Sequence, residues 1–255
     1  MLALVVGFQA LLEVQSGSVA RARVILGEAQ QIARERGLVE SEGWTTMFPG
    51  WNEWIDGDAE RAVSYCRRAL ELAERIGSPF SIAWGLGSLA LALAHAGSSE
   101  ALEVAERSVA LCRERGTSLE GEGQHLAALA EACVVTGDLA RALRVAEEAV
   151  EISRTRRSRR CEIDAWLALA RALRANGDAA SLARAGDALA QVDALADATR
   201  APNWRHVAEL ERAEIAALAG DAAARERHLR AALAGFEEIE AEYRVRQIRA
   251  LLGAP

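Results

Sequence analysis

The sequence contains no lysine, and all thirty of its basic residues are arginine. Without lysine there is no Walker-type phosphate loop and no Schiff-base chemistry. Proline and tyrosine are scarce, with four and two copies, whereas alanine, leucine, arginine and glutamate dominate, which is typical of an all-helical protein. The net charge of −7 argues against broad binding to nucleic acid or to anionic membranes.

Long apolar segments and paired cysteines are also missing. No stretch is long and apolar enough to span a bilayer, and the apolar start, MLALVVGFQALLEV, lacks the basic n-region of a signal peptide. No C-x-x-C pair occurs among the four cysteines, which are Cys66, Cys112, Cys133 and Cys161. At least the first three fall at apolar helical positions, so we expect reduced core cysteines in a cytoplasmic protein.

A glycine repeat organises the chain. The anchor glycines, spaced by forty residues and at the end by forty-three, are Gly17, Gly57, Gly97, Gly137, Gly177 and Gly220. Each glycine suits the left-handed position after a helix, and the Asp or Ser that follows suits the cap of the next helix. A second glycine series (Gly37, Gly77, Gly116) closes the second helix of the early repeats. The pattern predicts six helical hairpins at approximately 1–37, 38–77, 78–116, 117–160, 161–200 and 201–239, with a capping segment at 240–255.

A small residue stands seven positions before each anchor glycine. These positions hold Ala10, Gly50, Ala90, Ala130, Ala170 and Ala213. Two helices of a hairpin can cross closely only where side chains are small. This lattice resembles the tetratricopeptide repeat, which implies a right-handed superhelix. The period of forty instead of thirty-four, and the lack of the terminal proline, leave HEAT-like repeats as the alternative.

Several long segments extend this resemblance. They are GSPFSIAWGLGSLALALAHAG, ALEVAERSVALCRERGTSLEGEG, GDLARALRVAEEAVEISRTRRSRRCEIDAWLALARAL and GDAAARERHLRAALAGFEEIEAEYRVRQIRALL. Together they are similar to the C-terminal tetratricopeptide region of large bacterial signalling proteins that carry a class III adenylate or guanylate cyclase domain and an AAA-type ATPase. The resemblance implies that this chain is the regulatory tail of such a protein, without its enzyme, and the apolar, uncapped first helix agrees with a fragment.

No motif for catalysis, cofactor or metal binding is present. GLGSLA, beginning at Gly85, and GEGQHLA, beginning at Gly121, fall in helical register and follow no strand, so they do not indicate a nucleotide site. The four histidines form no pair at metal-binding spacing, and no serine lies in a G-x-S-x-G turn. We therefore expect a protein that is not an enzyme and holds no cofactor.

The segment RTRRSRR is the one strong charge cluster. It contains Arg154, Arg156, Arg157, Arg159 and Arg160. These arginines suit a solvated turn in which the helix dipole favours cations, and a docking patch for an acidic surface is the alternative. Nucleic acid is less suitable as a partner because no aromatic residues interleave with them.

In the tetratricopeptide register, the side chains that line the concave face belong to the residues thirteen, ten, six and three positions before each anchor glycine. The residues predicted to line this groove are Trp44, Met47, Trp51, Trp54, Trp84, Leu91, Gln124, Glu131, Asp164, Arg171 and Arg174. An aromatic wall beside small residues, with charges further along, is typical of a binding site. The same tryptophans would also suit a helical core or a homodimer interface. Pro49 lies within this segment and is expected to kink or split its helix.

Two functions from different classes remain open at this point. The first is a non-catalytic scaffold that binds a peptide or partner domain in the groove, and the second is a sensor for a small apolar molecule. A tail of an ATP-dependent transcription activator is a further alternative. An enclosed apolar pocket near Trp44 and Trp84 would favour the small ligand, whereas an open channel would favour a peptide.

Overall fold

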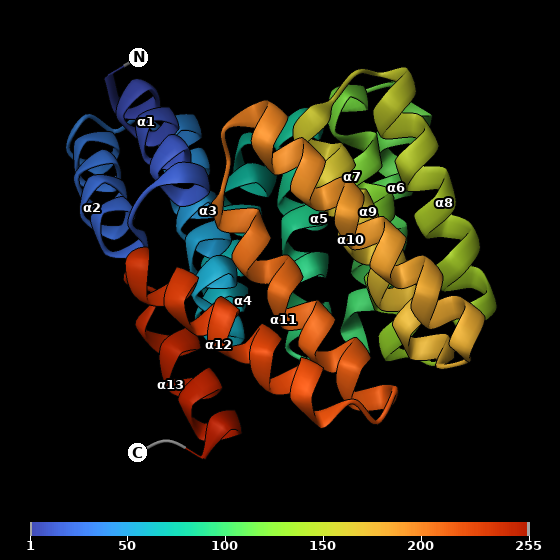
Figure 1. Ribbon diagram of the computed structural model, residues 1–255. Helices are drawn as coiled ribbons and strands as arrows, with labels where there is room; N and C mark the ends of the chain where they lie inside the picture. Colours follow the sequence, from blue (N-terminus) through green and yellow to red (C-terminus); the bar gives the residue numbers. More distant parts are fainter. Residues whose placement is uncertain (1, 254–255) are drawn as a thin grey trace.

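The computed structural model describes residues 2–253, which form thirteen α-helices and one short 3-10 helix and contain no strand. The helices are α1 (Leu2–Ser16), α2 (Val19–Glu35), α3 (Val39–Asp56), α4 (Ala59–Ile76), α5 (Pro79–His95), α6 (Glu100–Arg115), η1 (Leu119–Gly121), α7 (Glu122–Val135), α8 (Leu139–Thr155), α9 (Arg159–Asn176), α10 (Ala179–Thr199), α11 (Asn203–Leu218), α12 (Ala222–Glu238) and α13 (Glu242–Leu252). Consecutive helices pair into six antiparallel hairpins, followed by α13 (Figure 1). The predicted all-α solenoid is confirmed.

The turns within the hairpins have the chemistry that the repeat predicts. Asp58 and Asp138 each accept a hydrogen bond from the backbone N–H three residues on, and so cap α4 and α8. Gly57 and Gly177 have φ values of 90° and 78° at the ends of α3 and α9, where a side chain would strain the backbone. The left-handed φ predicted for the anchor glycines is found at Gly57, Gly97, Gly137, Gly177 and Gly220 but not at Gly17, and Ser99 gives α6 no side-chain cap. The predicted turn chemistry is therefore confirmed for most of the hairpins and is wrong at these two positions.

Close helix crossings explain the small residues. A Cβ at Gly50 would lie 2.6 Å from Cys66 Sγ and 3.3 Å from Ala62 O of the paired helix α4. The equivalent alanines are at most 1% exposed; they are Ala10, Ala90, Ala130, Ala170 and Ala213. The role predicted for Gly50 is confirmed. All four cysteines are buried and free, as expected.

Pro49 does not split its helix. α3 continues from Val39 to Asp56, although Pro49 has no N–H to donate to the carbonyl of Thr45. The expected split is therefore wrong, because Pro49 is buried within a continuous helix; the expected kink stays a prediction. Within residues 2–253, no helix is both long and apolar enough to cross a membrane.

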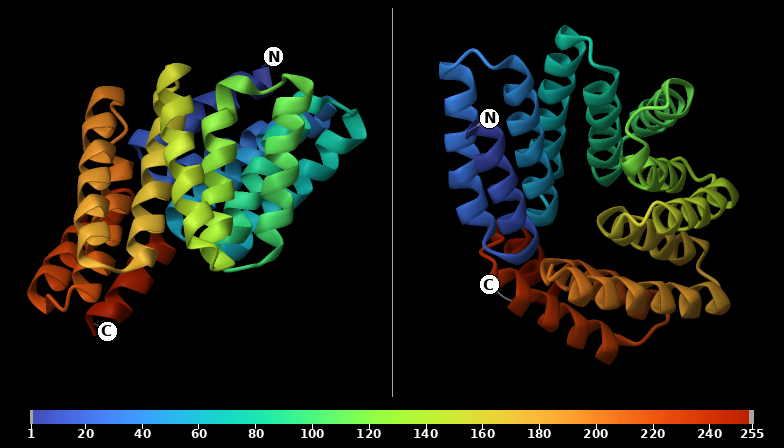
Figure 2. Two further views of the ribbon diagram at one scale, coloured as in Figure 1. Left: turned by 90° about the vertical axis from the view of Figure 1, so that its right-hand side faces the viewer. Right: turned by 90° about the horizontal axis from the view of Figure 1, so that it is seen from above.

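The superhelix closes into a ring. Seen from above in Figure 2, the hairpins follow one another around a circle, and the C-terminal helices return to the N-terminal ones. α1 contacts α11, and α3 contacts α13. The Asn203 side chain at the start of α11 donates hydrogen bonds to Val14 O (2.9 Å) and Gly17 O (3.0 Å). The N–H of Val19 donates to Ile239 O at 2.7 Å, so hydrogen bonds join the two ends of the chain.

The N-terminus of α13 is capped by a side chain from α3, which is distant in the sequence. Ala241, at its cap position, has no polar side chain, and Asp56 Oδ1 of α3 instead accepts a hydrogen bond from the N–H of Tyr243 at 3.0 Å. Asp56 Oδ2 also accepts from Arg23 Nη2 at 2.5 Å. The carboxylate of Asp56 therefore joins α2, α3 and α13 at the ring closure.

Candidate functional site

The first helix of each hairpin faces the interior of the ring, and two cavities lie along these helices. At the N-terminal ends of α3, α5, α7 and α9 is a cavity of about 450 Å³, here named the aromatic cavity. At the C-terminal ends of the same helices is a cavity of about 610 Å³, here named the polar cavity. The narrow region between them is named the waist.

Six rings line the aromatic cavity. They are Phe8, Trp44, Phe48, Trp51, Phe80 and Trp84. Neighbouring rings pack in tilted or edge contacts, with centroids 5.6 to 6.4 Å apart. The Trp51 indole N–H donates to Ser88 Oγ at 3.0 Å, and the Trp84 indole N–H donates to Glu120 Oε1 at 3.4 Å. These bonds fix two indoles while leaving the tryptophans only partly buried.

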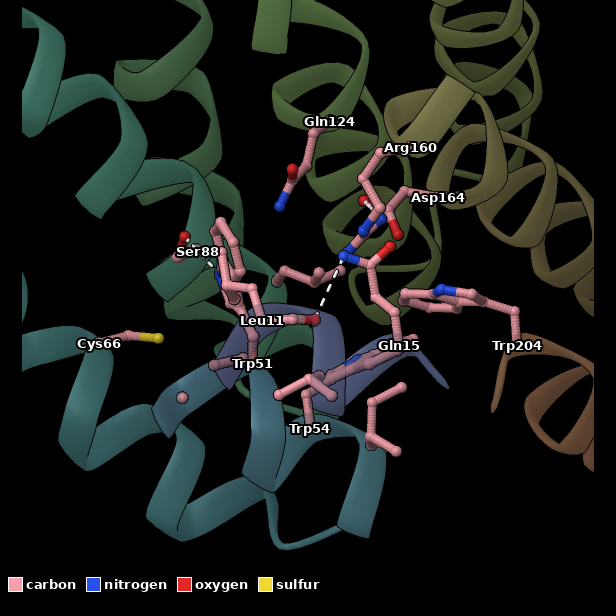
Figure 3. A pocket seen from close by; sticks show the side chains of 15 residues that line it. Leu11, Gln15, Trp51, Trp54, Cys66, Ser88, Gln124, Arg160, Asp164 and Trp204 are labelled. Carbon is pink, nitrogen blue, oxygen red and sulfur yellow. Dashed lines mark hydrogen bonds and ion pairs between the residues drawn. The ribbon is translucent and has the colours of Figure 1, made fainter. Parts of the chain in front are cut away.

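The waist is closed by side chains from opposite sides of the ring (Figure 3). Arg160 Nη1 lies 2.5 Å from Asp164 Oδ2, and the Arg160 guanidinium stacks over the Trp204 ring at 4.3 Å. Trp54 packs on Trp204 with centroids 5.1 Å apart. Only about 20 Å³ remains open here, which is room for about one water molecule. The two cavities are therefore separate in this conformation.

Arg171 is the centre of a charged network in the polar cavity. Its Nη1 donates to Glu131 Oε1 and its Nε to Glu211 Oε1, both at 2.6 Å. Nη1 also lies 2.8 Å from His95 Nε2, which accepts the indole N–H of Trp54 at 3.3 Å. α3, α5, α7, α9 and α11 each contribute one of these side chains.

The network shifts the pKa values of its members. Burial lowers the pKa of His95, and the nearby Arg171 lowers it further. Burial alone would raise the pKa of Glu131, but Arg171 and His95 outweigh it and hold that pKa at about 2. At neutral pH, Glu131 is therefore a carboxylate and His95 a neutral acceptor.

Ten of the eleven predicted groove residues line the two cavities or the waist. Trp44 and Trp84 lie in the aromatic cavity, and Trp51 and Gln124 reach from it into the waist. The waist also holds Leu91 and Asp164, and the polar cavity holds Glu131, Arg171 and Arg174; Trp54 lies in both. Met47 lies apart from them: it is 3% exposed and packs behind the tryptophans against Phe48 and Ala69.

The arginine cluster is divided between two sides of the ring. Arg154, Arg157 and Arg159 border an outer hollow of about 590 Å³ beside α10. Arg156 instead binds Glu122 at 2.6 Å, and Arg160 points inward to the waist. The five arginines therefore do not form a single patch.

The register missed several residues of the site. Phe8 belongs to α1, where no groove residue was predicted, and Phe80 lies one helical turn before Trp84, the first predicted groove residue of its repeat. Both side chains are exposed beside the tryptophans, which only the fold shows. The sequence gives His95 no partner at metal-binding spacing, and its contacts with Trp54 and Arg171 arise only in the fold. Arg244 belongs to α13, which reaches the polar cavity because the ring closes.

The remaining histidine, cysteine and acidic side chains are the candidates for a metal site or an accessible base. Within residues 2–253, no group of three or more His, Cys, Asp or Glu side chains is placed to hold a metal ion. His125 lies between Ser108 Oγ (3.1 Å) and Ser118 Oγ (3.0 Å). It is 1% exposed, so substrate has no access to it.

Neither protein-family models nor curated protein sequences match this chain. Among solved structures it is similar to a Rap protein complexed with competence and sporulation factor, with a TM-score of 0.66 and 12% identity, covering 98% of this chain and 80% of that one. It is also similar to a signal transduction ATPase with numerous domains (STAND) with a tetratricopeptide repeat sensor from Pyrococcus horikoshii, with a TM-score of 0.52 and 16% identity. That match covers 98% of this chain and 38% of the other. These likenesses show a tetratricopeptide-like fold.

Proposed function

We propose that this chain is a non-catalytic repeat scaffold that binds a short segment of a peptide or partner protein inside its ring. The aromatic cavity carries the proposal. It combines six rings with a volume of about 450 Å³, which is large enough for two or three apolar side chains and lies within the usual range of ligand pockets. Partly exposed tryptophans are the residues that most often anchor a partner.

The polar groups around the cavity suit an extended polypeptide. Gln124 and Ser158 on the wall offer both donors and acceptors, and Gln15 reaches in from α1. A bound segment would satisfy its backbone N–H and C=O groups on these side chains while its apolar side chains enter the rings. The Rap protein, similar in fold, is complexed with competence and sporulation factor, which supports a binding role for this fold.

We further propose that the scaffold regulates a larger signalling protein that carries a cyclase or ATPase domain. The family resemblance of the repeats and the fold of the STAND protein's sensor support this context. The outer hollow beside Arg154, Arg157 and Arg159 would then dock an acidic surface of a neighbouring domain. Determining the natural sequence on either side of this chain tests the context directly.

A second candidate is a sensor for a small apolar molecule. The waist favours it, since it separates the aromatic cavity from the rest of the interior. A small ligand would fill the aromatic cavity alone, so its affinity would be independent of the polar cavity. The affinity of a peptide that spans the waist would instead depend on residues of both cavities.

Affinity selection from random seven-residue synthetic peptides tests the main proposal. The native chain should enrich apolar or aromatic peptides, and a Phe80→Ala/Trp84→Ala variant should lose them by about thirtyfold or more, because a single anchor of this kind contributes about 2 kcal/mol. Leu218→Ala, which removes an exposed apolar side chain outside the ring, is the matched control. Equal enrichment by the native chain and the double variant would contradict the proposal. Binding of apolar small molecules alone would support the second candidate.

A further inference from the structure

Arg244 is left without an anion in the polar cavity. Its guanidinium forms part of the wall, donates to Gln247 Oε1 at 3.1 Å and reaches Trp54 O at 3.5 Å. Its Nε is buried without a hydrogen-bond partner, and among residues 2–253 no carboxylate oxygen lies within 4.0 Å of the guanidinium. Arg244 is half-buried, and a partly desolvated guanidinium is normally paired with an anion, so Arg244 can donate to a further partner.

The carboxylates nearby are already engaged. Glu131 binds Arg171, and Glu211 is shared between Arg171 and Arg174, whose Nε lies 3.2 Å from Glu211 Oε2. Burial and the positive charge of Arg171 lower the pKa of Arg244 to about 10. The side chain is therefore still charged at neutral pH, and an added anion would be stabilised there.

The location explains why three arginines gather at one end of the ring. The polar cavity lies at the C-terminal ends of α3, α5, α7 and α9, where carbonyl groups carry partial negative charge and favour cations. Glu60, the remaining acid on the wall, is exposed at the rim. Water screens its charge, so the three arginines of the wall face two buried carboxylates, those of Glu131 and Glu211. Asp56, whose charge also acts on Arg244, is already bound to Arg23.

α3 sets the distance between the two cavities. It contributes Trp44 to the aromatic cavity, and Gly57 at its end lies in the polar cavity against Arg244. At 1.5 Å per residue, this stretch is about 20 Å long, which an extended segment of about six residues would span. Such a segment would pass the waist, where Arg160 and Asp164 would have to move aside.

We infer that the polar cavity binds a carboxylate of the same segment whose apolar side chains occupy the aromatic cavity, with Arg244 as its main partner and Arg174 beside it. This inference rests on the proposed function and adds the chemistry of the ligand. The carboxylate is either the C-terminus of a peptide or an acidic side chain about six residues from the apolar anchor. A planar guanidinium fork matches either one with two parallel hydrogen bonds.

The test uses the seven-residue random peptides in two forms, with a free C-terminal carboxylate and with a C-terminal amide. If the carboxylate is the C-terminus, the free form should bind at least tenfold more tightly to the native chain. If it is a side chain, both forms should bind and Asp or Glu should be enriched at one position. Arg244→Gln should remove the preference, Arg244→Lys should retain part of it, and Arg249→Gln, on the outer side of the same helix, should leave it unchanged.

The outcomes separate this inference from the proposed function. If the two forms bind equally, no acid is enriched and Arg244→Gln binds like the native chain, the inference is wrong while binding at the aromatic cavity stands. If no peptide binds, the proposed function fails and the inference fails with it. Folding is checked by thermal melting, in which Arg244→Gln should melt at the native temperature or above it, because it removes an unpaired charge.

Discussion

At the residue scale, His125 shows how a titratable group can be purely structural. The hydroxyl proton of Ser108 is donated to Ala83 O at 3.0 Å, so Ser108 Oγ accepts from Nδ1–H of His125, and Nε2 accepts from the Ser118 hydroxyl. A neutral imidazole satisfies all of these groups. Burial lowers its pKa from 6.5 to about 4, partly offset by Glu122.

This shift makes stability depend on pH. Between pH 6.5 and 4, His125 is protonated in the unfolded chain but neutral in the folded chain, so the free energy of unfolding falls as the pH drops. We expect a loss of about 2 kcal/mol from His125 between pH 7 and pH 5, measured by urea unfolding. His125→Gln should have a reduced slope, keeping only the part due to His95 and His206, whose pKa values burial also lowers. An unchanged slope in this variant would show that His125 is not the titrating group.

The crossing alanines give a second residue-scale prediction. Ala130 is fully buried where α7 crosses α8, so Ala130→Leu should overpack the hairpin and lower the free energy of unfolding by about 1–3 kcal/mol. Ala217→Leu, on the exposed face of α11, is the control and should change it by less than about 0.5 kcal/mol. Equal effects of the two substitutions would mean that the crossing is not close-packed.

At the scale of helices, Arg171 ties α9 to α7 and α11 through two glutamates. Arg171→Met would leave Glu131 buried without a cationic partner and Glu211 with Arg174 alone, so we expect a loss of about 3–5 kcal/mol in chemical unfolding. Removing the glutamate charges as well, with Glu131→Gln and Glu211→Gln, should recover part of it. Arg230→Met, which breaks the exposed pair with Glu226, should cost less than about 1 kcal/mol.

The aromatic side chains of α3 and α5 differ in how far they serve stability. Trp51 is partly buried and hydrogen-bonded to Ser88, so Trp51→Ala should lower the free energy of unfolding by about 2–4 kcal/mol as well as weaken binding. Phe80 is 39% exposed, and Phe80→Ala should weaken binding with a change below about 1 kcal/mol in stability. Unfolding curves and peptide affinity, measured on both variants, separate the two roles.

The elements that were predictable from sequence are those encoded within one repeat. The glycine after each first helix, the aspartate cap and the small crossing residue act locally, so their spacing predicts six hairpins and the inward face of the first helices. The ends of the site are different, because Phe8 and Arg244 reach it from α1 and α13. Their position depends on the rotation between repeats summed around the ring, which no single repeat encodes.

The arginine run illustrates the same limit on a smaller scale. Arg154 belongs to the last turn of α8, and Arg156 and Arg157 lie in the turn before α9, which begins at Arg159. Arg160 already follows helical periodicity and points inward to Asp164. A shift of one residue in a helix start turns a side chain by about 100°. Helix boundaries inferred from sequence are not accurate enough to divide such a run.

At the scale of the molecule, the ring depends on a few polar contacts between its ends. Asn203 is 1% exposed, and its amide satisfies two carbonyl groups at the end of α1. Asn203→Ala should lower the free energy of unfolding by about 1–3 kcal/mol and increase the radius of gyration in small-angle X-ray scattering. A less stable variant with unchanged scattering would show that the remaining contacts keep the ring closed without Asn203, namely the hydrogen bonds of Val19 and Tyr243 and the apolar cluster that contains Val14 and Ile239.

Ring closure also changes how the chain should fold. In an open solenoid each repeat contacts only its neighbours, so folding can start anywhere and the end repeats fray independently. Here Val19 pairs with Ile239 and Asp56 with Tyr243, contacts that join segments far apart in the sequence. We expect closure to be a late and slow step of folding, because contacts between distant segments form slowly. Once formed, it couples the two termini, so amide hydrogens of α1, α2 and α13 should exchange as one cooperative unit.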